Sequence, residues 1–447
     1  MAPLLESTRR DFIRTGTAAL AGAAALHGLP FIHTAHAKPD DPIRVGVIGC
    51  GGRGTGAILN VLQAGTRVIY PQWGYHTEDV AENARRGAEG ISVVALADLF
   101  EDRLTQCRGQ LAKIDVTIPD DHCFVGWDAY EKLLAVPEIN YVILTEPPHF
   151  RPAHLMAAIQ AGKHVFMEKP VAVDGPGVKL VLEAGELAAQ KGLGIAAGTQ
   201  RRHDPQYVET VTRLQDGAIG EIHTGRAYWN GGVIWAVPRQ EGWSDMEWQV
   251  RNWNYFTWLS GDHIVEQHVH NLDVINWVMG AHPIRAHALG GRQARPNDPT
   301  FGHVYDHFAV EYEYENGARM YSQCRQMDGT ASRVEEAVEG TNGSSNCYSW
   351  IRPHSGSPWR YEGEKPNPYE QEHQDLINSI RAGTPINDAR DVALSTLTGI
   401  MGRESAYTGQ PVTWEQALNM RSLGPAKYEF GPAEFPAVAV PGVYRGV

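Results

Sequence analysis

The chain has 447 residues, of which 43% are hydrophobic, and its formal net charge is −13 at pH 7. This length can bury the cores of two ordinary domains. The acidic balance argues against nucleic acid or an anionic membrane surface as a partner. Five scattered cysteines show no metal-binding spacing and no disulfide framework, although a bridge that leaves out Cys50 stays open.

The N-terminus has the pattern of an export signal. Arg9 and Arg10 precede Phe12, a mildly apolar stretch follows, and Ala35-His36-Ala37 offers a small-residue cleavage site. The stretch is shorter than the roughly 20 residues of a spanning helix. We therefore expect a twin-arginine signal peptide at residues 1–37, export to a periplasmic or other extracytoplasmic space, and no membrane insertion. A disordered basic N-terminus is the alternative.

A glycine-rich loop follows the first predicted strand, at residues 43–48. Residues 49–54 match the pattern G-x-G-x-x-G, and residues 57–64 have the character of a helix. In a strand–loop–helix unit these glycines allow a tight turn and let a pyrophosphate approach the helix N-terminus. The predicted cofactor-binding residues here are Gly49, Gly51, Gly52, Arg53 and Gly54. A generic glycine-rich turn is the alternative.

Asp98 is the candidate ribose-binding acid, at the end of a second predicted strand, residues 91–98. Such an acid usually lies about 20 residues beyond the loop, so the longer spacing predicts an insertion at roughly residues 65–90. An acid at this position binds ribose hydroxyls and repels a 2′-phosphate, which favours NAD over NADP. The alternative role of Asp98 is a helix N-cap.

The alternation of strands and helices continues to residue 170. Residues 141–145 and 164–167 are predicted strands, with a helix at 152–161 between them. Repeated units of this kind predict a doubly wound parallel sheet, which binds ligands at the carboxyl ends of its strands. Thr145 and Glu168-Lys169 fall at such ends. We therefore predict a nucleotide-binding domain at residues 38–170.

Three segments together carry a family resemblance: the glycine loop, Ala161-Gly-Lys-His-Val-Phe-Met-Glu-Lys-Pro170, and His270-Asn-Leu-Asp273. With them the chain resembles the glucose–fructose oxidoreductase / inositol dehydrogenase / MocA (Gfo/Idh/MocA) family. The resemblance implies an α/β protein, with an N-terminal Rossmann domain and a C-terminal α+β domain built on an open, mostly antiparallel sheet. Most members oxidise or reduce sugars and polyols with NAD(P), and some are glycosidases that use bound NAD.

The resemblance also assigns roles to residues. Lys169 matches the lysine beside the nicotinamide, His270 matches the catalytic histidine, and Glu168 is expected to contact the cofactor or support the site. Glu266 stands where most members carry aspartate, and we include it among the catalytic candidates. On one helix, His263, Glu266, His270 and Asp273 would share a face about 80° wide. Zinc binding by this face and a non-catalytic core network are the alternatives, and we predict no metal.

The second domain is predicted at residues 171–430. Glu315-Asn316-Gly317 predicts a tight hairpin, and residues 369–381 and 392–407 are predicted helices that return to the nucleotide domain. The tail at residues 431–447 is predicted to be extended and to cover a neighbour. Half of the twelve tryptophans lie between Trp229 and Trp258, which favours carbohydrate stacking over an aromatic core or an oligomer contact. The candidate substrate-binding residues are Arg201, Arg202, Trp235, Trp253 and Asp273, although surface exposure of the arginines is an equal alternative and Asp273 is expected to hold His270.

The sequence therefore predicts an exported, NAD-dependent oxidoreductase that acts on a sugar, polyol or glycoside and retains its cofactor. We expect a dimer or tetramer. An NAD-dependent glycoside hydrolase or lyase is the second hypothesis, and a non-catalytic sugar-binding protein on the same fold is the third.

Overall fold

The computed structural model describes residues 41–65, 80–81 and 84–446. The predicted signal peptide and most of the predicted insertion lie outside these residues. Within the part that is described, no helix is both long and apolar enough to cross a membrane. All five cysteines are free, so the disulfide bridge that the sequence analysis left open does not form.

The first sheet has six parallel strands in the order β3-β2-β1-β4-β5-β6. The strands are β1 (Ile43–Ile48), β2 (Ile91–Asp98), β3 (Cys123–Val125), β4 (Tyr141–Leu144), β5 (His164–Met167) and β6 (Ile195–Ala197). The central strands are nearly continuous apolar runs because both faces of the sheet are covered. The predicted doubly wound sheet is confirmed, and its last strand lies beyond the boundary that we predicted at residue 170.

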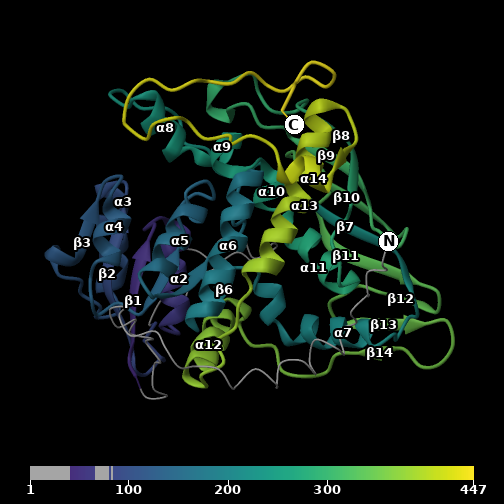
Figure 1. The fold of residues 1–447 in the computed structure, drawn as a ribbon, viewed down its shortest axis with the longest axis horizontal. Coiled ribbons are helices and arrows are strands. Elements are labelled where there is room, and N and C mark those ends of the chain that lie inside the picture. Colours follow the sequence, from purple (N-terminus) through teal and green to yellow (C-terminus); the bar gives the residue numbers. More distant parts are fainter. Residues whose placement is uncertain (1–40, 66–79, 82–83, 447) are drawn as a thin grey trace, which may run out of the picture. The chain divides into compact units, whose positions relative to one another are not determined.

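Helices cover both faces of this sheet (Figure 1). One core contains residues of α4 (Ala129–Leu134), α5 (Arg151–Gln160) and α6 (Gly175–Lys191). The opposite core contains residues of α2 (Gly52–Val61), α3 (Glu101–Ala112) and α12 (Pro368–Arg381). The return of α12 to the nucleotide domain, predicted from its sequence, is therefore confirmed.

The second sheet has nine strands in the order β14-β13-β12-β11-β7-β10-β9-β8-β15. They are β7 (Ile222–Gly231), β8 (Arg285–Gly291), β9 (His307–Glu313), β10 (Arg319–Gln326), β11 (Arg333–Gly340), β12 (Gly343–Ser345), β13 (Trp350–Pro353), β14 (Trp359–Arg360) and β15 (Val412–Thr413). Every pairing is antiparallel except that of β7 with β10. β9 and β10 form the predicted hairpin, with Gly317 at φ +87° in its turn.

Two long helices pack on one face of the second sheet, α11 (Val269–Met279) on β7 and α13 (Ala389–Thr408) on β8 and β9. The strands alternate buried and exposed residues accordingly, and Leu289 and Tyr321 stand exposed on the other face. The remaining helices are α7 (Pro205–Gln215), α8 (Asp245–Arg251), α9 (Thr257–Ser260), α10 (His263–Glu266) and α14 (Trp414–Leu418). Short 3₁₀ turns lie at η2 (Asp120–His122), η3 (Gln200–His203), η4 (Trp253–Tyr255) and η5 (Pro299–Phe301).

The tail after residue 431 packs on its own chain. Ala433 donates its N–H to Asp245 of α8, and the Tyr305 hydroxyl donates to the carbonyl oxygen of Ala439. The tail is extended, as predicted, and the surface that it covers includes α8 and the segment before β9.

His203 links η3 to α12 and generates a prediction about stability. Its Nδ1 lies 2.7 Å from a carboxylate oxygen of Asp375 and its Nε2 lies 3.7 Å from Asp388. Burial opposes the imidazolium charge, but these two carboxylates outweigh burial and raise the pKa of His203 to about 10. The resulting stabilisation is complete below the ordinary histidine pKa of about 6.5 and is lost as pH rises through about 10.

We predict that His203→Gln lowers the free energy of unfolding by about 2 kcal/mol at pH 6, because two partly exposed carboxylates lose the charged hydrogen-bond partner between them. The difference between wild type and variant should shrink by pH 10.5, as measured by urea unfolding at both pH values. An equal difference at the two pH values would show that the charge of His203 contributes nothing.

Candidate functional site

A cavity of about 890 Å³ lies at the carboxyl edge of the first sheet. Residues of the Rossmann domain and of the second domain line this cavity. From the first come Gly49, Gly51, Gly52, Arg53, Asp98, Thr145, Glu168 and Lys169, and from the second come Trp235, Trp253, Glu266 and His270. Twelve of the site residues predicted from the sequence therefore line one cavity.

The glycine loop has the shape that a diphosphate needs. Gly49 adopts φ +95°, and a Cβ on Gly54 would lie 1.9 Å from the carbonyl oxygen of Gly49. A Cβ on Gly51 would meet nothing within 4 Å, so that side of the loop is open. No side chain caps the start of α2 at Gly51, which leaves its first N–H groups available for an anion. Thr145 supports the loop by donating its hydroxyl to the Gly49 carbonyl over 2.6 Å.

Asp98 ends β2 beside this loop. Its carboxylate accepts hydrogen bonds from the N–H groups of Cys50, at 2.6 Å, and Phe100, at 2.8 Å. Burial raises the pKa of Asp98, and these two bonds lower it in part. The N-cap of α3 is Phe100, so Asp98 does not occupy the N-cap position that we considered as its alternative. The loop and the acid thus fit an adenosine dinucleotide, with Asp98 placed for the ribose.

Arg53 and Glu168 are bound to each other. Arg53 Nε lies 2.5 Å from Glu168 Oε1, and a second nitrogen lies 3.4 Å from Glu372 of α12. The Arg53 guanidinium also lies over the ring of Tyr369, 5.4 Å from its centre. These contacts tie the glycine loop to the end of β5 and to α12. Direct contact of Arg53 or Glu168 with a cofactor stays a prediction.

Lys169 joins the two domains at the cavity. Its Nζ donates to the carbonyl oxygen of Glu266 at 2.7 Å and to Glu266 Oε1 at 3.0 Å. The next residue, Pro170, follows through a cis peptide bond, and its carbonyl oxygen accepts a bond from the buried Arg151. The lysine side chain is only 10% exposed, so its amine is held at one place in the cavity wall.

His270 lies near this lysine, on α11. Its ring stacks on Trp229 with 5.9 Å between centres, and its Nδ1 is buried without a hydrogen-bond partner among the described residues. Burial lowers the pKa of His270 well below its ordinary value, and the charges of Lys169 and Arg201 lower it further. The imidazole is therefore neutral at neutral pH and can accept a proton.

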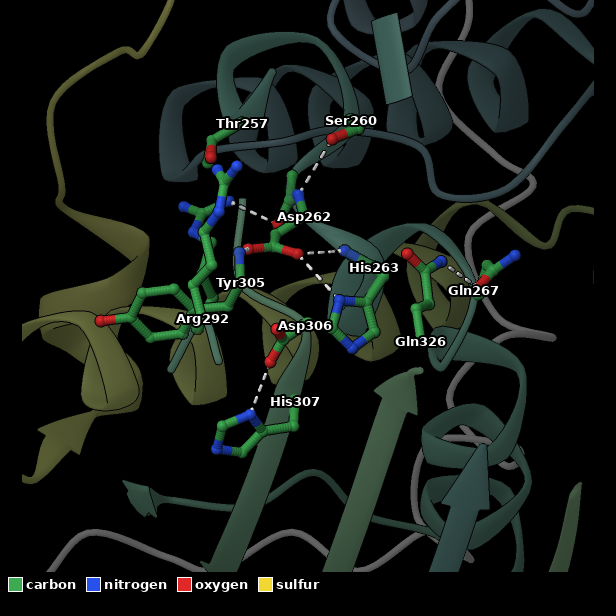
Figure 2. A network of polar contacts seen from close by, with 12 residues as sticks. Thr257, Ser260, Asp262, His263, Gln267, Arg292, Tyr305, Asp306, His307 and Gln326 are labelled. Atoms are coloured by element: carbon green, nitrogen blue, oxygen red, sulfur yellow. Dashed lines mark hydrogen bonds and ion pairs between the residues drawn. The ribbon is translucent and has the colours of Figure 1, made fainter. Parts of the chain in front are cut away.

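The prediction of one helix carrying four polar residues was wrong. The segment forms two helices, α10 and α11, that are separated at Gln267 and His268. Of the four predicted residues, only Glu266 and His270 line the cavity. His263 turns to Asp262, with Nδ1 3.0 Å from the carboxylate, as Figure 2 shows.

Asp262 determines where α10 begins. Its buried carboxylate accepts bonds from the N–H and Nδ1 of His263, from the Tyr305 N–H at 2.8 Å and from the Tyr407 hydroxyl at 2.5 Å. The residue has φ +69°, which a side chain other than glycine rarely adopts. Figure 2 shows this network between α9, α10 and the start of β9. Asp262 thereby fixes the position of Glu266 four residues later.

Three predicted substrate residues lie outside the cavity lining. Arg202 binds both oxygens of Asp273, at 2.8 and 2.9 Å, and Arg201 pairs with Glu336. Both ion pairs join segments that are far apart in the sequence. The sequence therefore gave no indication of which carboxylates the arginines would bind. A role of these three residues in binding substrate finds no support in their placement.

The tryptophans divide into two groups. Trp235 is 42% exposed and lies edge to face with Trp253, 5.7 Å between centres, on the cavity wall. Trp229, Trp248 and Trp258 are buried in the cores. An open aromatic surface and an aromatic core, which we had treated as alternatives, are thus both present.

Several cavity residues escaped the sequence analysis. They are Glu146, His149, Trp127, Tyr369 and Tyr428. Glu146 is buried, its carboxylate accepts no hydrogen bond from the part of the chain that the structure describes, and His154 lies 3.3 Å away. The sequence held one usable signal, the position of Glu146 and His149 just after β4, at the carboxyl edge of the sheet. Tyr428, near the end of the chain, gave no such signal.

The fold and the cavity define a class of protein, the dinucleotide-binding oxidoreductases with a second domain over the Rossmann sheet. Residues 43–198 match the model of the oxidoreductase family with an NAD-binding Rossmann fold, GFO_IDH_MocA, and residues 207–346 match the GFO/IDH/MocA C-terminal domain. The chain belongs to the Gfo/Idh/MocA family, an oxidoreductase family with an NAD-binding Rossmann fold.

Relatives agree with this assignment. An inositol 2-dehydrogenase/D-chiro-inositol 3-dehydrogenase of Halalkalibacterium halodurans is 31% identical over 30% of this chain and 35% of its own length. A glycosyl hydrolase family 109 protein of Solibacter usitatus is 23% identical over 56% of this chain and 53% of its own. The matches with the first curated relatives thus span about a third to two fifths of those proteins.

Solved structures share the fold. The aldose-aldose oxidoreductase of Caulobacter crescentus, complexed with glycerol, superposes with a TM-score of 0.62 at 18% identity, over 83% of this chain and 99% of that one. An oxidoreductase of Agrobacterium radiobacter in complex with NAD⁺, L-tartaric acid and magnesium gives 0.59 at 16% identity, over 84% and 99%.

The loop geometry predicts different effects for two glycine substitutions. Gly54→Ala forces the Gly49 carbonyl to move, so we expect about 2 kcal/mol of lost stability together with lost NAD binding. Gly51→Ala adds a methyl group in open space at an ordinary φ of −70°, so stability should be unchanged while NAD affinity falls. Thermal unfolding and NADH titration measure the two effects. Full NADH affinity in both variants would contradict the placement of the diphosphate.

Proposed function

We propose that the protein oxidises a hydroxyl-bearing carbon of a sugar or polyol, or reduces the corresponding carbonyl, with an NAD that stays bound through turnover. The observation that carries the proposal is one cavity that joins the glycine loop to the Lys169 amine and the neutral His270 imidazole. When bound, NAD supplies the acceptor or donor of a hydride.

The chain's own residues have separable tasks in this proposal. His270, neutral and desolvated, takes the proton from the substrate hydroxyl during oxidation and returns it during reduction. Lys169 donates a hydrogen bond to the reacting oxygen, and Glu266 holds its amine in the cavity wall. Most members of the family carry aspartate at the position of Glu266. The longer glutamate side chain still reaches the amine of Lys169.

Substrate recognition is proposed for the tryptophan pair. The exposed Trp235 and the partly buried Trp253 line the same cavity as Lys169 and His270, and sugars present apolar C–H faces that pack on such rings. The names of the relatives, inositol dehydrogenases and an aldose-aldose oxidoreductase, support a cyclic polyol or aldose as the substrate class. Oxidation of one carbohydrate followed by reduction of a second would regenerate the cofactor in place.

We predict that Lys169→Ala and His270→Ala each lower kcat by about 10² to 10⁴, the usual contribution of a positioned proton donor or acceptor. Glu266→Asp should keep a larger share of the activity. The assay is reduced-nicotinamide absorbance with a panel of inositols, aldoses and glycosides, and bound NAD is quantified in every variant. Wild-type activity in Lys169→Ala protein that is fully loaded with NAD would remove the lysine from the mechanism.

The same panel separates the other hypotheses. The similarity to a glycosyl hydrolase family 109 protein is the reason for including glycosides. Release of the leaving group without net nicotinamide reduction would favour the hydrolase or lyase. Sugar binding with neither outcome would favour the binding protein.

Export is part of the proposal, because retention of NAD matters most where free NAD is scarce. We predict that protein from the exported cell fraction keeps close to one NAD per chain after extensive dialysis, measured by mass spectrometry. Replacing Arg9 and Arg10 by lysine should leave the protein in the cytoplasmic fraction. Exported protein without NAD would contradict retention, and unchanged export of the lysine variant would contradict the twin-arginine signal.

Assembly into a dimer or tetramer also stays a proposal. The uncovered face of the second sheet, with Leu289 76% exposed and Tyr321 46% exposed, offers an apolar surface that fits a second copy of the chain.

A further inference from the structure

A segment near the end of the chain crosses the rim of the cavity. We call residues 423–431 the covering segment. At one end, the Leu423 N–H donates to Asp174, at the start of α6, over 2.9 Å. At the other end, the Gly431 carbonyl oxygen accepts a bond from the Met246 N–H of α8 over 3.1 Å. Figure 1 shows the C-terminal chain, in yellow, passing α8 and α9. The segment is therefore held at both ends and spans between the two domains.

Two aromatic residues of the covering segment face the first domain. Tyr428 lines the cavity, and its hydroxyl lies 2.7 Å from Nε2 of His149. Burial lowers the pKa of His149 to about 4, so a neutral imidazole shares this bond at neutral pH. The Tyr428 ring also lies 5.9 Å from Trp127 and 5.7 Å from Phe150. Tyr428 thus joins the tail to the loops that follow β3 and β4.

Phe430 lies closer to the ribose-binding acid. Its ring stacks on Phe100 with 5.9 Å between centres and an angle of 20°, and it lies 5.4 Å from Trp127. Phe100 is the residue whose N–H donates to Asp98. Phe100 and Trp127 follow β2 and β3 and line the cavity, as Asp98 does, so Phe430 packs against the wall that we assign to the adenosine half.

Helix α8 reinforces the same edge. Arg251 binds Asp102 of α3 with its closest contact at 2.9 Å, and its guanidinium lies 3.8 Å from the centre of the Phe100 ring. Phe100 is thus contacted by Arg251 of α8 and by Phe430 of the covering segment. Both elements come from beyond the Rossmann sheet, so Phe100, in the cavity wall next to Asp98, is supported from outside that sheet on two sides.

The exposure of the two rings argues against a purely structural role. Tyr428 is 45% exposed and Phe430 48% exposed, so each buries only about half of its surface in the fold. Rings that are half in solvent contribute modestly to folding. Tyr428 lines the cavity itself, and Phe430 packs on Phe100 and Trp127, which also line it. A planar ligand such as adenosine would pack against this aromatic edge.

We propose that the covering segment, through Tyr428 and Phe430, retains NAD by closing the cavity over its adenosine half. This inference rests on the proposed function, since it explains how a cofactor would stay bound through turnover.

The test compares release of bound NADH from wild type and from the double variant Tyr428→Ala/Phe430→Ala. Loss of two aromatic contacts should speed release by about tenfold or more, with nearly unchanged thermal unfolding of the cofactor-free protein. Phe435→Ala is the matched control, because Phe435 is 45% exposed in the same tail but packs on Trp248 and Phe256 outside the cavity lining. Release is followed by loss of NADH fluorescence after an excess of NAD⁺ is added.

Unchanged release in the double variant, or equal acceleration by Phe435→Ala, would overturn the proposal. ADP-ribose, which lacks the nicotinamide, should also dissociate faster from the double variant, and an effect on NADH alone would contradict a cover over adenosine. If the double variant does not fold, Tyr428→Phe and Phe430→Leu take its place, and wild-type release from both would be equally decisive.

A wild-type protein that loses NAD on dialysis would contradict retention as stated under the proposed function. The cover is then judged separately, by whether the double variant binds NADH about tenfold more weakly than wild type.

Discussion

The contact between Lys169 and Glu266 is the constraint on which the site depends. Lys169 lies two residues after the end of β5 in the Rossmann sheet, and Glu266 ends a four-residue helix of the second domain. A helix this short has little stability of its own. It is held in place by the buried Asp262, which gathers donors from α10, from the segment before β9 and from α13. The amine is therefore positioned by the packing of the whole second domain.

The basic side chains Arg53 and Lys169 of the cavity are paired with carboxylates, while His270 is uncharged. Arg53 is matched by Glu168 and Glu372, and Lys169 by Glu266. His270 is surrounded by cations and by apolar surface, so both influences act against its protonation. Removing charge from one imidazole while neighbouring charges remain paired creates a proton acceptor at neutral pH.

Local patterns predicted the fold better than they predicted the wider site. The glycine loop, Asp98, Lys169 and His270 were found because each stands at a strand end or in a motif whose chemistry depends on near neighbours in sequence. The single helix predicted across residues 263–273 failed because periodicity alone carried no sign of the break at Gln267. The prediction that Arg202 and Asp273 bind substrate failed for another reason. The two residues are 71 positions apart in the sequence, and only the folded structure shows that they form an ion pair with each other.

The order of the chain matters for how the cavity is closed. The Rossmann strands come first, His270 comes from the middle of the chain, and the aromatic rings that meet Phe100 and Trp127 come from the last 20 residues or so. The wall beside Phe100 and Trp127 is thus completed by the last segment of the chain, which in our proposal lies across the way out of a bound dinucleotide. Such an order suits a protein that binds its cofactor in the cytoplasm and crosses a membrane already folded, as the proposed export requires.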